Sequence, residues 1–309
     1  MLSPMLYLNG SIMPLADGRV SVEDRGFQLG DGVYEVLKID NGRLLWLEDH
    51  LERLDWSTGQ VLLSGALDGH PLAEILPRLV SMSGLRQGTA YVQVTRGAAP
   101  REFALPSGVE PTVLAYVRPH EFPSDDEVCA GIAVHAVEDL RWARCDIKST
   151  NLLPAVLAKH AAGEAGAREA LYVSADGVVR EGGSSNAFVV LDGTLRTHPA
   201  NNRILNGITR CHVLDLAREL GFPVLEQAVH VSDLPRASEI FIASTIRDVM
   251  PVVRVGGLDT GMLTPGGGVP GEMTMALAEA MRSLIARCVG VPAPPRRFPD
   301  ASKGNSTPR

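Results

Sequence analysis

The chain has 309 residues, of which 45% are hydrophobic and 21% are charged, and its formal net charge at pH 7 is −7. This length is about twice the ~150 residues typical of one domain, so we expect two globular domains and exclude a disordered or collagen-like chain. The acidic net charge and the lack of a basic stripe argue against nucleic acid as a partner, because such binding needs clustered Lys and Arg.

The same sequence predicts a cytoplasmic protein without a membrane partner. No apolar run approaches the ~20 residues that cross a bilayer, and the first residues lack the basic and apolar regions of a secretory signal. Neither a disulfide framework nor a metal site is expected, because the four cysteines are far apart and show no ligand spacing. They are Cys129, Cys145, Cys211 and Cys288.

Residues 1–119 are predicted to form a small N-terminal α/β domain. Asn-Gly pairs at 9–10 and 41–42 lie between apolar runs and predict hairpin turns. Leucines at helical spacing predict two helices, the second containing Pro77, which is unfavourable inside a helix. Extended segments are expected at 5–8, 32–39, 44–47, 90–96 and 111–117, and helices at 47–54 and 72–80. Residues 97–110 form a long Pro- and Gly-containing loop, and such loops in compact domains are usually functional.

Residues 120–128 are polar and contain proline, which is typical of an interdomain linker. Residues 129–289 are predicted to form a larger C-terminal α/β domain. Its strands are expected at 131–137, 170–173, 187–191 and 239–243, and its helices at 154–166, 208–220 and 272–289. Residues 290–309 have the composition of a disordered tail.

Lys148 is one of only four lysines in the chain. Small and apolar residues surround it at the end of a predicted extended segment. An amine in a dry site has a lowered pKa, as a Schiff-base nucleophile requires. An ordinary surface lysine is the simpler interpretation of this residue when it is taken alone.

Gly207 precedes a predicted amphipathic helix whose first residues are Ile208 and Thr209. The free N–H groups at such a helix start bind phosphate, although the glycine can equally serve only as a turn. The pair Ser244 and Thr245 follows another predicted strand. Arg53, on the first predicted helix, is a potential bidentate phosphate ligand or a solvated side chain.

Glu181 opens a Gly- and Ser-rich turn before a predicted strand. A carboxylate facing a heterocyclic nitrogen keeps that nitrogen protonated, although an exposed loop acid is the simpler interpretation. A lysine nucleophile, a carboxylate for a pyridine nitrogen and a helix start for phosphate together match what pyridoxal 5'-phosphate needs.

Five blocks of the sequence resemble, in order, the signatures of the fold-type IV pyridoxal-phosphate enzymes: DRGFQLGDGVYEV, DIKSTNLLPAVLAK, EGGSSNAFVV, THPANNRILNGITR and FIASTIRDVMPV. Among these class IV aminotransferases the D-amino-acid transaminases are most similar, and the resemblance extends from about residue 5 to residue 289. It implies the two-domain α/β (α+β) fold of D-amino-acid aminotransferases. It also implies a homodimer, in which loops of the neighbouring subunit close each active site.

The resemblance implies roles for the residues that match the family. Lys148 would form the aldimine with the cofactor and move the proton, and Glu181 would pair with the pyridinium nitrogen. The other cofactor-binding residues are expected to be Arg53, Leu205, Gly207, Ile208, Thr209, Ser244 and Thr245.

Four residues are expected to bind the substrate: Tyr34, Arg101, Ser184 and Arg247. The D-amino-acid transaminases clamp the substrate carboxylate with an Arg-x-His pair, and here Arg101 is followed by Phe103 in place of the histidine. Because phenylalanine donates no hydrogen bond, part of the clamp is missing. Arg247 stands where the family often has a small polar residue, and it either supplies the lost charge or is paired and structural.

The predicted function is a ping-pong transamination that moves the amino group of a D-amino acid to a 2-oxo acid, either 2-oxoglutarate or pyruvate. Two alternatives use the same fold. One is an (R)-amine or branched-chain aminotransferase. The other is an aminodeoxychorismate lyase, which releases pyruvate and needs no amino acceptor.

Overall fold

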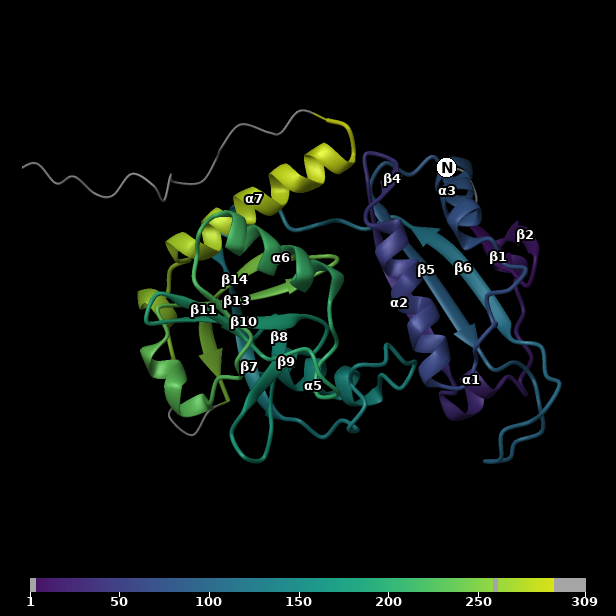
Figure 1. Ribbon diagram of the computed structural model, residues 1–309, viewed down its shortest axis with the longest axis horizontal. Coiled ribbons are helices and arrows are strands. Elements are labelled where there is room, and N and C mark those ends of the chain that lie inside the picture. The colour runs from purple at the N-terminus through teal and green to yellow at the C-terminus, as the bar shows by residue number, and fades with distance from the viewer. Residues whose placement is uncertain (1–3, 258–260, 292–309) are drawn as a thin grey trace, which may run out of the picture. The chain divides into compact units, whose positions relative to one another are not determined.

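The computed structural model describes residues 4–257 and 261–291, which divide into two compact units (Figure 1). The first unit contains the described residues up to Glu121 together with Ile147–Leu152. The second contains Phe122–Asp146 and the described residues from Leu153 onward. The segment with Lys148 therefore belongs to the first unit, although the residues on both sides of it belong to the second. Of the predicted tail, residues 290–309, the part from residue 292 onward lies outside the described residues.

A six-stranded antiparallel sheet forms the first unit, in the order β2-β1-β6-β5-β3-β4. Its strands are β1 (Met5–Leu8), β2 (Ser11–Pro14), β3 (Gly32–Asp40), β4 (Arg43–Leu44), β5 (Gly88–Thr95) and β6 (Thr112–Arg118). Its helices are η1 (Leu15–Asp17), α1 (Arg25–Leu29), α2 (Leu47–Gln60) and α3 (Leu72–Ser83). Asn9 and Asn41 adopt positive φ angles of 44° and 47°, as the predicted hairpin turns require.

The two faces of this sheet differ because side chains alternate along each strand. One face carries Val33, Leu37 and their neighbours into a core covered by α2 and α3. Helix α3 continues through Pro77, since its apolar side is buried in that core. The predicted extended segment at 44–47 is wrong at its end, because α2 begins at Leu47 after a left-handed Trp46.

The sheet of the second unit has eight strands in the order β12-β11-β10-β13-β14-β7-β8-β9. They are β7 (Ile132–Glu138), β8 (Glu169–Val173), β9 (Val179–Gly182), β10 (Asn186–Leu191), β11 (Thr194–Thr197), β12 (Val224–Leu225), β13 (Glu239–Ser244) and β14 (Asp248–Gly256). Strand β7 runs parallel to both β14 and β8. Strand β9 also pairs with β10 where Glu181 faces Asn186, so the sheet closes on itself at this point.

Helices of the second unit pack on this sheet, α5 on β7 and β8, α6 on β13, and α4 and α7 on β14. They are α4 (Asp125–Ala130), α5 (Leu153–Glu164), α6 (Ile208–Glu219), η2 (Val231–Arg236), η3 (Pro265–Gly267) and α7 (Glu272–Cys288). Helix α4 begins inside the segment predicted as a linker, because Ser124 and Glu127 form a capping box. None of the helices in the described ranges combines the length and hydrophobicity needed to cross a bilayer.

Candidate active site

Lys148 is fixed beside the first residues of β3. Its carbonyl accepts a hydrogen bond from the Tyr34 N–H at 2.9 Å, and Ser149 forms a β-bridge with Val33. Ile147 is buried in the core, so the next side chain points to the other face of the sheet. There the Lys148 Nζ lies 4.5 Å from the centroid of the Tyr34 ring. The structure thus brings together two residues that the sequence predicts for the site.

Three tyrosines line the face of the sheet on which Lys148 lies. Tyr34 stacks on Tyr91 with ring centroids 5.7 Å apart, and Tyr91 stacks on Tyr116 at 5.2 Å. Burial raises the pKa of Tyr91 well above its ordinary value. The hydroxyl therefore stays neutral, and the stack provides a rigid aromatic surface beside the amine.

A buried glutamate organises the α2 side of β3. Glu35 is 0% exposed and accepts hydrogen bonds from Arg53 Nε at 2.6 Å, Arg53 Nη2 at 2.9 Å and His50 Nδ1 at 2.7 Å. Burial raises the pKa of Glu35, but the Arg53 charge and the His50 and Arg53 hydrogen bonds outweigh it and lower the pKa to about 2. Arg53, a predicted phosphate ligand, is thus oriented by a permanently charged partner.

His50 belongs to this cluster and is fully buried. Burial lowers its pKa despite the bond to Glu35, and the charges of Arg53 and Lys148 lower it further. Within the described ranges its Nε2 has no hydrogen-bond partner. A neutral imidazole therefore lies within the electrostatic reach of Lys148.

Glu181 lies in β9 of the second unit, where it is only 5% exposed. Its carboxylate accepts hydrogen bonds from Arg141 Nη1 at 2.5 Å, Asn186 Nδ2 at 3.1 Å and the Leu205 N–H at 3.1 Å. Burial raises its pKa to about 7, and Arg141 and the Leu205 N–H offset part of this effect. Glu181 is therefore not an exposed loop acid, and the structure brings it together with Leu205, another residue expected to bind the cofactor.

Arg141 and Asn186 are functional candidates that the sequence reasoning missed. The Arg141 guanidinium also binds both oxygens of Asp139, at 2.9 and 3.0 Å, and lies 4.0 Å from the centroid of the Tyr172 ring. The side-chain amide of Asn186 bridges Glu181 and the Leu205 carbonyl. Both residues lie within or near blocks that resemble the family, but pattern alone does not pair residue 141 with residue 181.

The start of α6 has the donors that an anion requires. Gly207 is its N-cap and offers no side chain, so the first N–H groups of the helix are left for a ligand. Thr209 Oγ1 and Ser244 Oγ are both buried and lack a hydrogen-bond partner in the part of the chain that the structure describes. A Cβ at position 207 would lie 2.2 Å from Asn186 Oδ1, so this close approach requires glycine. Unpaired hydroxyls beside a helix N-terminus fit a phosphate group.

The predicted substrate-binding residues have separate environments. Ser184 is exposed, accepts a hydrogen bond from Lys159 Nζ at 3.0 Å and donates one to Glu169 Oε2 at 3.0 Å. Arg247 donates to the Arg168 carbonyl at 3.1 Å. Both residues are held by the second unit, whereas Arg101 belongs to the first.

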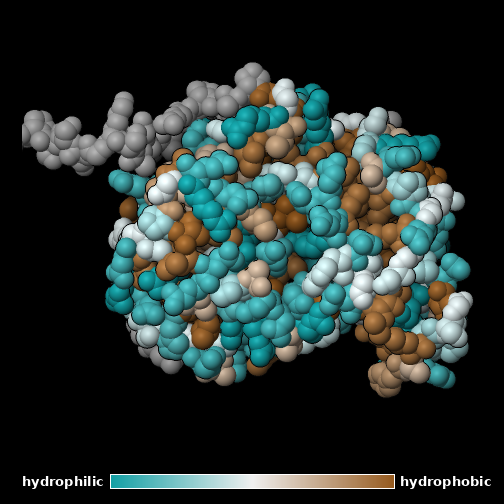
Figure 2. All heavy atoms as spheres, viewed as in Figure 1, coloured by the Kyte–Doolittle hydropathy of each residue, from teal (hydrophilic) through white to brown (hydrophobic). Residues whose placement is uncertain are grey.

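Arg101 lies on the exposed loop that connects β5 to β6. Phe103 on the same loop is 87% exposed, and Figure 2 shows hydrophobic residues gathered on the surface that this loop forms. Arg25 Nη1 holds the loop by donating to the Glu102 carbonyl at 2.6 Å. The loop therefore presents an arginine and an apolar ring to the outside of its unit.

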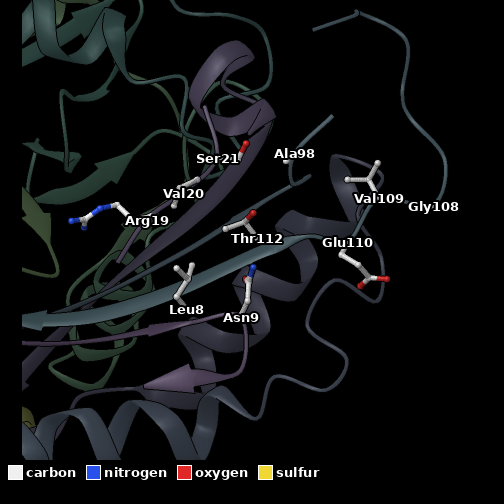
Figure 3. Close-up of a pocket in the computed structure, with 10 residues that line it drawn as sticks. All are labelled: Leu8, Asn9, Arg19, Val20, Ser21, Ala98, Gly108, Val109, Glu110 and Thr112. Carbon is white, nitrogen blue, oxygen red and sulfur yellow. The ribbon is translucent and has the colours of Figure 1, made fainter. Parts of the chain in front are cut away.

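Neither of two cavities found within single units contains a predicted site residue. One, in the first unit, measures about 410 Å³ and lies between β1, β6 and residues 19–21 and 108–110. Its two charged side chains, Arg19 and Glu110, extend away from each other (Figure 3). The other, in the second unit, measures about 400 Å³ and lies beside the ends of β7 and β8.

Comparison with known proteins finds aminotransferases, both by a family model and among individual relatives. A family model described as amino-transferase class IV matches residues 32–255. A D-alanine aminotransferase of Bacillus licheniformis is 41% identical over 280 residues, which cover 91% of this chain and 96% of the relative. A D-alanine aminotransferase of Staphylococcus haemolyticus is 36% identical over 281 residues, covering 91% and 97%.

Solved structures show the same fold. The branched-chain amino acid aminotransferase of Escherichia coli superposes with a TM-score of 0.80 at 24% identity, covering 91% of this chain and 94% of that one. The branched-chain aminotransferase of Thermoproteus uzoniensis with norvaline gives a TM-score of 0.76 at 26% identity, covering 93% and 95%. A hypothetical aminotransferase from Mycobacterium tuberculosis, in its PLP-bound form, gives 0.76 at 22% identity, covering 92% and 99%.

Proposed function

We propose that this chain, which belongs to the class IV aminotransferase family, transfers the amino group of a D-amino acid to a 2-oxo acid such as 2-oxoglutarate or pyruvate. The observation that carries this proposal is the 41% identity to a D-alanine aminotransferase over nine tenths of the chain. The branched-chain enzymes with the same fold are only 24–26% identical. Enzymes of this family use pyridoxal 5'-phosphate.

We assign the cofactor contacts residue by residue. Lys148 would hold the cofactor through Nζ, and Glu181 would pair with the pyridine nitrogen. Leu205, whose N–H donates to Glu181, would pack on the ring. The phosphate would be held by Arg53, Gly207, Ile208, Thr209, Ser244 and Thr245. The buried unpaired hydroxyls and the glycine-started helix support the phosphate assignment.

The chain's own residues then perform three tasks. When bound, pyridoxal phosphate supplies an aldehyde carbon that takes up the amino group and a ring that accepts the electron pair of the broken Cα–H bond. Lys148 Nζ removes the proton from the substrate Cα, and the Tyr34 ring beside it restrains the amine. Glu181 holds a proton on the pyridine nitrogen through charge pairing.

We assign substrate recognition to Tyr34, Arg101, Ser184 and Arg247. Arg101 is the proposed anchor for the substrate carboxylate, because it matches the arginine of the family's Arg-x-His pair and is exposed in its unit. Phe103 replaces a hydrogen-bond donor with an apolar ring, so we expect modest affinity for D-Ala and measurable tolerance of apolar amines.

A single-turnover panel tests the proposed function. The protein is loaded with pyridoxal phosphate and mixed with D-Ala, D-Glu, L-Leu or an (R)-arylamine without an acceptor. We expect the two D-amino acids to react fastest and D-Ala to release one pyruvate per active site. A faster reaction with L-Leu or with the arylamine would show that D-amino acids are not the preferred substrates. Pyruvate formed catalytically from aminodeoxychorismate without a 2-oxo acid would identify a lyase.

We also propose that the protein acts as a homodimer in the cytoplasm. Leu153, Val156 and Leu157 recur at helical spacing on α5, and all three are exposed in the single chain. Apolar residues in this arrangement form one face of a helix, and a contiguous exposed face marks an interaction surface. A second copy of the chain is the proposed occupant, as the resemblance implies.

Sedimentation tests the dimer. We expect wild type to sediment as a dimer and a Val156→Asp, Leu157→Asp double variant as a monomer. Leu225→Asp, which changes an exposed leucine on β12, is the matched control and keeps the dimer. An active wild-type monomer would contradict the proposal. Fractionation of cells that express the chain tests the cytoplasmic location.

A further inference from the structure

One arginine of the second unit, Arg141, contacts two carboxylates, those of Glu181 and Asp139. Arg141 Nη1 donates to Glu181 Oε1 at 2.5 Å, while its Nε and Nη2 donate to the two oxygens of Asp139. The Arg141 Cζ lies over the Tyr172 ring, 4.0 Å from its centroid. Three different contacts therefore fix the position of one charge beside Glu181.

The other groups that face Glu181 cannot supply this charge. Asn186 on β10 and the Leu205 N–H are neutral donors. Tyr172 on β8 and Cys145 are neutral near pH 7, because burial raises the pKa of the tyrosine to about 12 and that of the cysteine to about 11. Asp139 carries the same sign of charge as Glu181. Among the described residues of the second unit, the electrostatic environment of Glu181 is thus dominated by Arg141 and Asp139.

We propose that Arg141 is the positioning residue that favours the negatively charged form of Glu181 for the pyridine nitrogen, and that Asp139 limits the strength of this effect. The role of Glu181 toward the pyridine nitrogen rests on the proposed function. The electrostatic relation among the three side chains is a property of the chain itself.

The physical reason is the cost of burying a charge. A carboxylate removed from water takes up a proton unless a nearby positive charge compensates the lost hydration. A neutral Glu181 would no longer stabilise a positive charge on the pyridine nitrogen. Asp139 neutralises part of the Arg141 charge. The Glu181 carboxylate therefore remains basic enough to accept a hydrogen bond from a protonated pyridine nitrogen.

The first experiment uses cofactor-free protein and therefore does not depend on activity. NMR of ¹³C-labelled glutamate, with Glu181→Gln for assignment, measures the pKa of the Glu181 carboxyl. We expect Arg141→Gln to raise this pKa and Asp139→Asn to lower it. Arg141→Lys retains the charge and should restore much of the wild-type value. Arg282→Gln is the matched control, since Arg282 also joins two acids, Asp125 and Glu279, and should leave the Glu181 titration unchanged.

The second experiment measures pyridoxal phosphate itself. We expect Arg141→Gln to weaken its binding about tenfold or more and to shift the pH dependence of its visible absorbance. In a Glu181→Gln background the same substitution should have little further effect, because Arg141 acts through Glu181. Thermal unfolding of every variant separates these effects from loss of the fold.

The outcomes distinguish this inference from the proposed function. An unchanged Glu181 pKa in Arg141→Gln would overturn the role of Arg141. If that variant does not fold, an unchanged Glu181 pKa in Asp139→Asn would overturn the electrostatic relation among the three side chains. Shifts of the same sign in Arg141→Gln and Asp139→Asn would overturn the role of Asp139. A wild-type protein that binds no pyridoxal phosphate, or binds it without transaminating, would contradict the proposed function and leave the result on cofactor-free protein intact.

Discussion

Glu35 in the first unit and Glu181 in the second are both buried glutamates bonded to an arginine, yet their pKa values lie far apart. Burial raises the pKa of each, but that of Glu35 is lowered to about 2 whereas that of Glu181 rises to about 7. Glu35 receives two hydrogen bonds from Arg53 and one from His50, whereas Glu181 shares Arg141 with Asp139. The distribution of positive charge around each carboxyl therefore decides the ionisation of these two buried acids. The first unit holds a carboxylate that stays charged, and the second holds a carboxyl that titrates near neutrality.

The largest expected effect comes from removing Lys148, and it tests whether the two regions have separate tasks. Lys148→Ala should lose transamination by several orders of magnitude, because both the nucleophile and the proton carrier are gone. Binding of pyridoxal phosphate should persist, since the Glu181 cluster and the start of α6 are untouched. Borohydride reduction followed by peptide mapping of wild type should place the cofactor on Lys148. An adduct on Lys38 or Lys159 would refute the assignment.

Removal of the Glu35 charge is expected to have the next largest effect. Glu35→Gln leaves the Arg53 charge without its carboxylate, and breaking such a buried pair costs about 3–5 kcal/mol of unfolding free energy. Urea denaturation measures this loss. Asp192→Asn breaks the exposed pair with Arg236 and serves as the control, with an expected cost below about 1 kcal/mol. Equal losses in the two variants would show that Glu35 is not specially stabilised.

The two glutamates should give opposite pH dependences of stability in cofactor-free protein. The lowered pKa of Glu35 contributes stability that is present above pH ~4.5 and is lost as the pH falls toward 2. Folded protein holds a proton on Glu181 between about pH 4.5 and 7 that the unfolded chain releases. Its contribution therefore falls as the pH rises through that window, by on the order of 3 kcal/mol.

Urea denaturation at pH 5 and pH 8 measures this contrast. Relative to wild type, Glu181→Gln should be more stable at pH 8 than at pH 5. Glu35→Gln should instead flatten the loss of stability below pH 4.5. A Glu181→Gln variant whose stability parallels that of wild type at both pH values would mean that Glu181 is ionised throughout.

Arg101 offers the smallest expected effect and contrasts with the paired arginines of both regions. Arg101→Ala removes a charge-assisted contact of roughly 1.5–3 kcal/mol and should raise the KM for D-amino acids about 10- to 150-fold. An (R)-arylamine has no carboxylate and should respond little. Unchanged kinetics with D-amino acids would mean that another residue binds the substrate carboxylate, and Arg247 would be the first to test. Equal losses for both substrate types would mean that Arg101 only orders the loop.

Local signals in the sequence predicted much of the fold. The Asn-Gly turns, the apolar spacing of α2 and α3 and the glycine before α6 depend on neighbouring residues, and each is confirmed in the structure. The capping box of α4 was missed, although Ser124 and Glu127 are a local signal as well.

The hydrogen bonds and ion pairs between residues far apart in the sequence could not be predicted from local signals. The bond between Arg141 and Glu181 and the cluster of Glu35 with Arg53 arise only when strands and helices pack. Glu181 was placed at a turn because β9 is short and rich in polar residues, whereas its burial depends on pairing with β8 and β10. The resemblance to a family supplied roles for single residues but not the charges that surround them.

The first unit is built from two separate stretches of the chain, and this has a consequence for protein engineering. A fragment that ends at residue 121 contains every strand of its sheet but lacks the segment Ile147–Leu152, which pairs with β3 and carries Lys148. During synthesis the unit is completed only after residues 122–146 of the other unit have left the ribosome. A transplant of this unit into another scaffold therefore has to carry both stretches, and the shorter one brings the reactive amine.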